Sequence, residues 1–303
     1  MSTQTQPGSA RSRAERTFFG QPWGLANLFG IELWERFSFY GMQALLAFYM
    51  YYATTEGGLG IDRPTALSIV GAYGGFVYMM ALVASFVGDR VLGPERTLYY
   101  SAILVMIGHV MLALVPGAVG LAIGLVCVGI GSGGVKTASQ VVLGDLYSRE
   151  DPRRDAGFSI FYMSVNIGGL LGPWLTGLVW GQAGFHWGFG LAAIGMAIGL
   201  VQYTVMRKST IGAAGSEVPN PLPRSEWAKW GLGVAAIALL LVGLLTTGIL
   251  PLDWLSWVVF AVALVATVVL LREMYASDQV TDAEKSRLTG YIPLLVGSVA
   301  FFA

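Results

Sequence analysis

The sequence predicts an all-α membrane protein that crosses the bilayer many times. Hydrophobic residues make up 55% of its 303 residues and charged residues only 12%, whereas a soluble domain carries about twice that charged fraction. The mean hydropathy of +0.64 points the same way. We therefore expect the lipid bilayer to surround most of the helices, and we expect no nucleic-acid partner.

Apolar segments follow one another along the chain, most of them near the ~20 residues that a helix needs to cross the hydrocarbon. They are residues 24–52, 65–88, 97–115, 119–144, 158–181, 187–206, 227–250 and 254–275, then an incomplete span at 291–303. We expect the interrupted last span to mean that the chain is part of a longer protein. The predicted divisions are a cytoplasmic tail (1–22), a six-helix bundle (23–208), a Gly- and Pro-rich cytoplasmic linker (209–226), an extra hairpin (227–275), and a linker that begins a further helix (276–303).

Lysines and arginines are distributed unequally between the two sides of the predicted membrane. Arg36 and Lys136 lie within spans, and all other lysines and arginines except Arg63 fall on the side of the N-terminus. Because Lys and Arg accumulate in cytoplasmic loops, the sequence predicts a cytoplasmic N-terminus.

Few residues offer the chemistry of an enzyme site. Cys127 is the single cysteine, and His109 and His186 have no neighbouring metal ligands in the sequence. No serine–histidine or aspartate-pair arrangement stands out. We therefore expect no catalytic residues, no metal and no organic cofactor.

The first span carries three formal charges. Glu32, Glu35 and Arg36 form one stripe with Tyr40 and Gln43, because residues three and four apart lie on the same helix face. Charges are costly in hydrocarbon, so the stripe should face protein or a wet cavity. It marks a functional site or, alternatively, an ion pair that only locks helices together. Two acids for one base favour function.

A glycine-rich span carries the second buried cation. Residues 129–134 match a dinucleotide-binding motif by letters, but they lie within a span and lack the strand-to-helix turn that such a site needs. Lys136 follows them, and it can pair with Glu32, with Glu35 or with a substrate carboxylate. A static ion pair within the bundle is the alternative.

Four other residues each leave two interpretations open. Asp89 and Arg90 lie where the second span turns back, and they either bridge moving helices or form a solvated turn. The Asn166 amide, on the fifth span, could hold a peptide-like backbone or an interhelical hydrogen bond. Tyr78 on the second span lines a cavity or only packs.

Four segments form an ordered set of motifs. They are Glu32-x-x-Glu35-Arg36-Phe37-Ser38-Phe39-Tyr40-Gly41-Met42, Gly88-Asp89-Arg90-x-x-Gly93, Gly131-x-Gly133-Gly134-Val135-Lys136 and Asp155-Ala156-Gly157-Phe158-Ser159-Ile160-Phe161-Tyr162-Met163-Ser164-Val165-Asn166. This set resembles the proton-coupled oligopeptide transporters of the major facilitator superfamily. The resemblance implies a twelve-helix core, of which this chain supplies the N-terminal six-helix bundle, an extra two-helix hairpin and the start of the seventh core helix; the C-terminal bundle would complete it.

The resemblance also implies a function and a set of roles. The function is symport of di- and tripeptides with protons by alternating access in a bacterial cytoplasmic membrane, with the proton as coupling ion and no cofactor. The implied residues are Glu32, Glu35 and Arg36 for proton coupling, Arg36, Tyr40, Gln43, Tyr78, Lys136 and Asn166 for substrate binding, and Asp89 and Arg90 for the conformational gate.

Two positions depart from the family pattern. Many members have Arg at the position of Gln43 and Tyr at that of Phe39. Without a cation at position 43, we expect weaker binding of a peptide carboxylate, or binding by Arg36 and Lys136 alone. A same-family transporter of another small solute, such as nitrate or a drug-like acid, therefore stays open. A truncated, non-transporting membrane scaffold is a further alternative.

Overall fold

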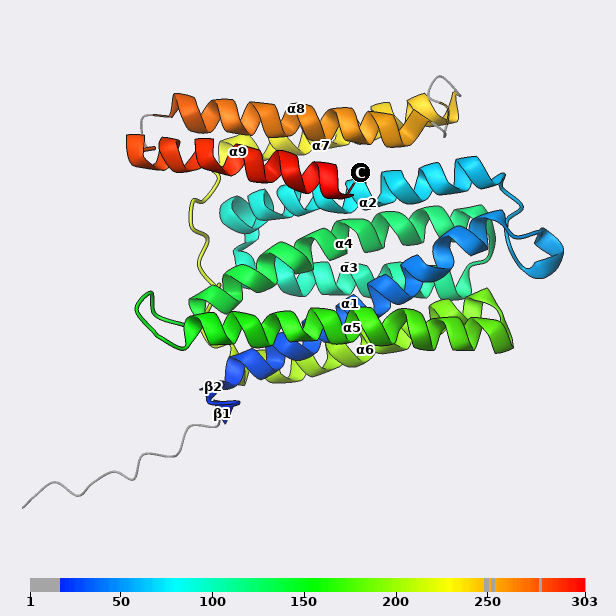
Figure 1. Cartoon of the computed structure of the whole chain (residues 1–303), viewed down its shortest axis with the longest axis horizontal. Coiled ribbons are helices and arrows are strands. Elements are labelled where there is room, and N and C mark those ends of the chain that lie inside the picture. The colour runs from blue at the N-terminus through cyan, green and yellow to red at the C-terminus, as the bar shows by residue number, and fades with distance from the viewer. Residues whose placement is uncertain (1–16, 248–250, 252–253, 278–279, 303) are drawn as a thin grey trace, which may run out of the picture.

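The computed structural model describes residues 17–247, 251, 254–277 and 280–302, and in that part nine α-helices run along the long axis of the molecule (Figure 1). Their bounds are α1 Trp23–Tyr51, α2 Arg63–Val87, α3 Pro94–Leu114, α4 Gly117–Asp145, α5 Arg154–Ala183, α6 Phe185–Thr210, α7 Arg224–Thr246, α8 Leu255–Ala276 and α9 Asp282–Phe302. The short elements are β1 Thr17–Phe18, β2 Gln21–Pro22, the 3₁₀ turn η1 Thr54–Glu56 and the π-helical turn η2 Gly88–Leu92. The predicted all-α class is confirmed.

Several described helices are suited to a membrane. Six are long and apolar enough to cross one: α2 together with η2, α3, α4, α5, α6 and α8. α1 is as long as α4, but it carries the three charges that the sequence places within it. These features identify a membrane protein with several spans.

Two helices begin four or more residues earlier than the hydropathy predicts. α5 starts at Arg154 and not at residue 158, with Asp155 in its first turn, where a carboxylate complements the helix dipole. α9 starts at Asp282, nine residues before the expected apolar run, because Thr281 and Glu284 exchange hydrogen bonds as a capping box. Polar residues therefore extend both helices beyond their apolar parts.

The charged segment of α1 lies between two hydrophobic cores. Leu25, Leu28 and Ile31 belong to one core, which includes parts of α3, α4 and α6. Phe39 and later residues of α1 belong to the other, with parts of α2, α4 and α6. Residues 32–36 occupy the interval between them, so the packing on both sides holds these side chains at a set depth in the bundle.

α1 packs mainly against α5 and α6. Glycines allow α5 to approach α1 closely. A Cβ on Gly168 would lie 2.5 Å from the Leu33 carbonyl oxygen, and a Cβ on Gly172 would clash with the Phe37 carbonyl oxygen. The hydroxyl of Thr176 donates to the Gly41 carbonyl oxygen at 3.1 Å. Small residues thus allow the backbones to touch, as expected for helices that associate in lipid.

The segment after α6 is ordered. Residues 211–223, here called the strap, cross the ends of α2, α3 and α4. The Asn220 and Leu222 N–H groups donate to the carbonyl oxygens of Asp89 and Arg90 at 2.9 and 2.7 Å. Gly215 accepts from the Glu95 N–H at 2.9 Å, and its own N–H donates to Asp145. The composition predicts a linker here, and the structure adds that it is docked on the bundle.

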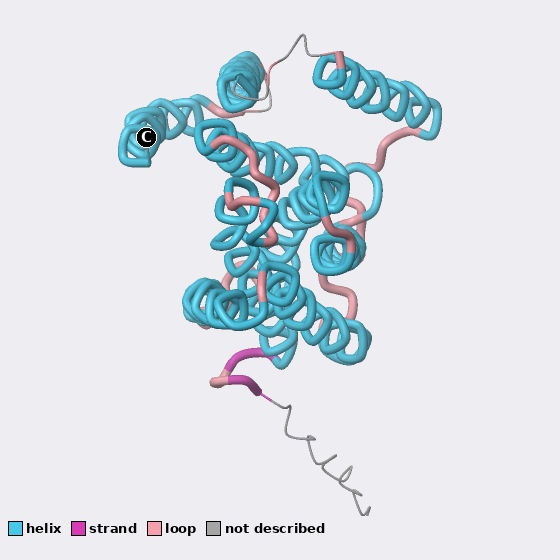
Figure 2. Tube along the Cα trace, turned by 90° about the vertical axis from the view of Figure 1, so that its right-hand side faces the viewer, coloured by secondary structure: helices cyan, strands magenta, loops and turns pink. Residues whose placement is uncertain are grey.

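The three last helices lie along one edge of the bundle, at the top of Figures 1 and 2. α8 packs against α2, where the hydroxyls of Ser68 and Ser256 are 3.3 Å apart. Most of the predicted tail, and the hairpin turn around Asp253, lie outside the described residues. The predicted hairpin helices are present as α7 and α8.

Candidate functional site

Three charged side chains of α1 form one buried ion-pair cluster. The Arg36 Nε atom lies 3.1 Å from Glu32 Oε1 and 2.6 Å from Glu35 Oε2. The exposed fractions are 3% for Glu32, 0% for Glu35 and 5% for Arg36. Two carboxylates therefore share one guanidinium in a buried place. The three groups together contain one more acid than base.

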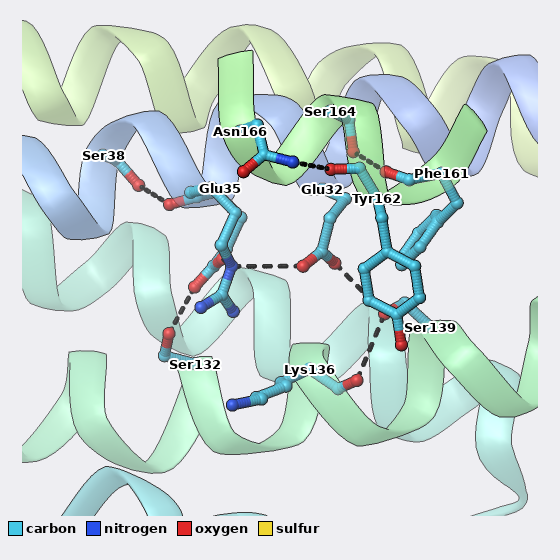
Figure 3. Close-up of polar contacts among 11 residues, drawn as sticks. Glu32, Glu35, Ser38, Ser132, Lys136, Ser139, Phe161, Tyr162, Ser164 and Asn166 are labelled. Carbon is cyan, nitrogen blue, oxygen red and sulfur yellow. Dashed lines mark hydrogen bonds and ion pairs between the residues drawn. The ribbon is translucent and has the colours of Figure 1, made fainter. Parts of the chain in front are cut away.

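Two serines of α4 hold the carboxylates from the other side. The Ser132 hydroxyl donates to Glu35 Oε1, and the Ser139 hydroxyl donates to Glu32 Oε2 at 3.1 Å (Figure 3). Both serines are fully buried. Ser132 lies about one helical turn before Lys136 on α4, and nothing in the sequence singled out Ser139. Their positions, four residues before and three after Lys136, were the available signal.

The α4 glycines explain why these serines reach α1. A Cβ on Gly131 would lie 2.6 Å from the Ser101 carbonyl oxygen of α3, and one on Gly133 would lie 2.6 Å from the Ala81 nitrogen of α2. α4 therefore touches the backbones of α2 and α3 through its glycines, while Ser132 between them and Ser139 after them reach α1.

Lys136 contacts an aromatic ring and neither of the two carboxylates of α1. Its Nζ atom lies 4.1 Å from the centre of the Tyr78 ring, a cation–π contact. Among the described residues, it forms no ion pair within 4.0 Å with Glu32 or Glu35, since those carboxylates already contact Arg36. Lys136 lies close enough to attract both of them electrostatically. Its ammonium group is thus open to a further anionic partner.

Tyr40 and Asn166 line the same hollow. This hollow of about 210 Å³ lies between α1 and α5, and its other lining residues are Val165 and Gly169. The Asn166 amide donates to the Tyr162 carbonyl oxygen of its own helix at 3.0 Å (Figure 3). Within the described part of the chain, no hydrogen bond to the Asn166 side-chain oxygen is formed. Gln43 is half-buried on α1, two turns after Arg36. The structure thus brings Tyr40 and Asn166 together.

Asp89 and Arg90 lie in the π-helical turn η2 after α2. Their carbonyl oxygens are capped by the strap, and within the described part of the chain their side chains form no ion pair. The ion pair near this end is instead Arg207 with Glu95, at 2.6 Å, with the Tyr203 hydroxyl donating to Glu95 at 3.2 Å. The sequence did not indicate this pair, because its members are 112 residues apart.

Comparisons with known proteins agree with the fold and the motifs. Residues 95–303 match the POT family (PTR2). An uncharacterized transporter of Bacillus subtilis, YclF, is 42% identical over 97% of this chain, and a di-/tripeptide transporter of Lactococcus lactis subsp. cremoris is 37% identical over 96%. The chain spans 60% of the length of each of these relatives.

Solved structures give the same result. A POT family transporter in complex with 5-aminolevulinic acid superposes with a TM-score of 0.87 at 40% identity, over 93% of this chain and 59% of that one. The peptide transporter POT in complex with sulfate gives 0.84 at 42% identity, over 94% and 58%. The family match covers more than half of the chain. This chain therefore belongs to the POT family of transporters.

Proposed function

We propose that the protein imports di- and tripeptides together with protons by alternating access. The observation that carries the proposal is the buried cluster in which Glu32 and Glu35 share Arg36. An intramembrane ionisable group is costly unless it is paired, and such groups mark ion pathways in transporters. The di-/tripeptide transporters among the relatives support peptides as the substrate class.

Charge balance suggests how protons couple to binding. Two carboxylates and one guanidinium leave one excess negative charge in a dry interior, and a bound proton removes it. Once Glu35 or Glu32 is neutral, its attraction for Arg36 falls. The guanidinium is then free to contact a peptide carboxylate, for which its planar fork is suited. Proton binding and peptide binding therefore favour each other.

We assign each remaining residue a role in transport from its position in the fold. Tyr40 and Asn166 line the hollow between α1 and α5 and would contact the peptide. Lys136, beside Tyr78, would bind an anionic group, and Gln43 would take part as a neutral polar contact. Asp89 and Arg90 would act in the conformational gate at the cytoplasmic end. The basic residues support a cytoplasmic N-terminus in the bacterial inner membrane.

The test is uptake of a labelled dipeptide by proteoliposomes that contain the full-length protein. We expect accumulation above equilibrium only with an inward proton gradient, and loss of accumulation when a protonophore is added. Unlabelled di- and tripeptides should compete, while nitrate or a drug-like acid should not. Gradient-independent uptake would contradict the proton coupling, and competition by nitrate alone would favour another solute.

Glu35→Gln and Glu56→Gln form a matched pair for this assay. Glu35 is buried in the cluster, whereas Glu56 is exposed in η1. We expect Glu35→Gln to abolish gradient-driven accumulation but to retain counterflow exchange, because exchange needs binding and reorientation but no charge change. Glu56→Gln should behave as wild type. Full gradient-driven accumulation by Glu35→Gln would remove Glu35 from the coupling site.

A further inference from the structure

Tyr73 has a buried hydroxyl group without a hydrogen-bond partner in the described part of the chain. The side chain lies on α2 and is only 5% exposed. Buried polar groups in proteins are nearly always paired, and each exception calls for a specific explanation. None of the roles assigned above uses this residue.

The ring of Tyr73 is held beside the charged cluster by its packing. It stacks on Phe39 with ring centres 6.3 Å apart, and the Arg36 guanidinium carbon lies 5.5 Å from the centre of the same Phe39 ring. A Cβ on Gly129 would lie 3.3 Å from Tyr73 Cε2, one helical turn before Ser132. Tyr73 is close enough to interact electrostatically with both Glu35 and Arg36.

The cluster contains other buried polar atoms that make no hydrogen bond to a described residue. Arg36 Nη2 is buried and makes no hydrogen bond to any described residue, and Glu35 Oε2 contacts only Arg36 Nε. Glu35 Oε1, in contrast, accepts from Ser132. If Arg36 turns away from Glu35, the Oε2 atom loses its one contact and needs another donor. The hydroxyl of Tyr73 is the uncommitted donor on the α2 side.

The groups around Glu35 are few. Glu32 and Arg36 face it from α1, Lys136 and Ser132 from α4, and Tyr73 from α2. Among the described residues, α5 and α6 contribute no buried charged side chain, whereas α3 contributes Glu95 and His109. Glu95 is paired with Arg207, and His109 forms no ion pair.

We propose that Tyr73 is a positioning residue for proton coupling, whose hydroxyl donates to Glu35 when Arg36 leaves it for the substrate. The proposal rests on the proposed function, because it assumes that Arg36 and Glu35 separate during transport. The hydroxyl would stabilise the ionised carboxylate at that step. Its loss should therefore make Glu35 keep its proton to higher pH.

The test compares Tyr73→Phe with wild type in gradient-driven dipeptide uptake between pH 5 and pH 9. We expect the midpoint of the pH profile to move up by about one to two units, since a hydrogen bond to a charged group contributes about 1.5–3 kcal/mol. Ser132→Ala removes the donor to the other oxygen and should shift the profile in the same direction. Tyr49→Phe is the control, because the hydroxyl of Tyr49 accepts from Gly117 far from the cluster, and its profile should not move.

A second measurement does not depend on transport. The infrared carbonyl band of protonated Glu35, identified by its absence in Glu35→Gln, is titrated in the presence of a saturating dipeptide. An unchanged midpoint in Tyr73→Phe, by uptake and by infrared, would overturn the role of Tyr73 even if wild type transports peptides. Absence of gradient-driven uptake in wild type would overturn the proposed function, and the infrared titration would then decide on Tyr73 alone. A purely structural Tyr73 would change only the melting temperature.

Discussion

Replacing Lys136 by Ala separates a role in transport from a role in folding. The ammonium group lies 4.1 Å from the centre of the Tyr78 ring, and Tyr78 is 64% exposed. An exposed cation–π contact contributes about 0.5–1 kcal/mol, which is roughly a two- to fivefold change in the folding equilibrium. Breaking a buried ion pair would cost about 3–5 kcal/mol. We therefore expect Lys136→Ala to lower the melting temperature only slightly.

The effect on transport should be larger. If Lys136 donates to the peptide carboxylate, the lost charge-assisted hydrogen bond costs about 1.5–3 kcal/mol. That corresponds to a fall in the kcat/KM of uptake of about 10- to 150-fold. Lys136→Arg keeps the charge and should therefore retain part of the activity. The rest should be lost, because the bulkier guanidinium fits poorly beside the glycines of α4. Tyr78→Phe keeps the ring and should change the cation–π contact little.

The assay is dipeptide uptake by proteoliposomes, divided by the amount of folded protein, together with the melting temperature of the same preparations. Wild-type uptake per folded molecule in Lys136→Ala would show that the side chain only packs. A stability loss of the size of a buried ion pair would refute the cation–π assignment and favour the pairing with Glu32 or Glu35 that the sequence suggested. Tyr78→Leu, which removes the ring, provides the matched stability control.

Three further predictions concern coupling, packing and the strap. Glu35→Gln should lose proton-driven accumulation yet retain counterflow exchange, measured in the same vesicles. Gly172→Ala should destabilise the protein by about 1–3 kcal/mol, because the new methyl group meets the Phe37 carbonyl oxygen; the check is thermal unfolding. Asn220→Pro should cost about 1 kcal/mol by removing the N–H that caps Asp89, and the check is the melting temperature and proteolysis of the strap.

Each of the two stability predictions has a control at a matched site. Gly177 lies on the same helix as Gly172, but a Cβ there would have no neighbour within 4 Å, so Gly177→Ala should be neutral. Asn220→Ala keeps the backbone N–H and should leave the strap in place. Equal effects at Gly172 and Gly177, or of Ala and Pro at position 220, would contradict the packing and capping that we describe.

Hydropathy was sufficient to predict the helices, because a spanning helix must be long and apolar in its own sequence. It placed α5 and α9 too late, since their first turns are polar and are stabilised by charge and capping at the helix start. It could not predict the docked strap. A Gly-, Pro- and Ser-rich segment has the composition of a flexible linker, and the bonds that hold it join residues far apart in the sequence, from 70 positions for Gly215 and Asp145 to more than 130 for Asn220 and Asp89.

The site could be predicted where its residues share one helix. Glu32, Glu35 and Arg36 lie within five positions of each other, so helical spacing alone brings them together. Contacts between helices were not accessible in the same way. Ser139 reaches Glu32 across 107 positions, and serines within spans usually bond to their own helix. The contact of Lys136 with the Tyr78 ring was not anticipated, because charge alone favours a carboxylate over an aromatic ring.

On α4, the same short glycine-rich segment packs against two neighbouring helices and supplies a hydrogen bond to the charged cluster. Gly131 and Gly133 let α4 touch α3 and α2, and the serine between them donates to Glu35. A larger residue at Gly133 would meet the backbone nitrogen of Ala81 and push α4 away from α2. The helix would then have to shift or rotate, and Ser132 would move with it. The glycines therefore position the carboxylate's partner without touching it, so a substitution there should disturb coupling and stability together, whereas Ser132→Ala should disturb coupling more than stability.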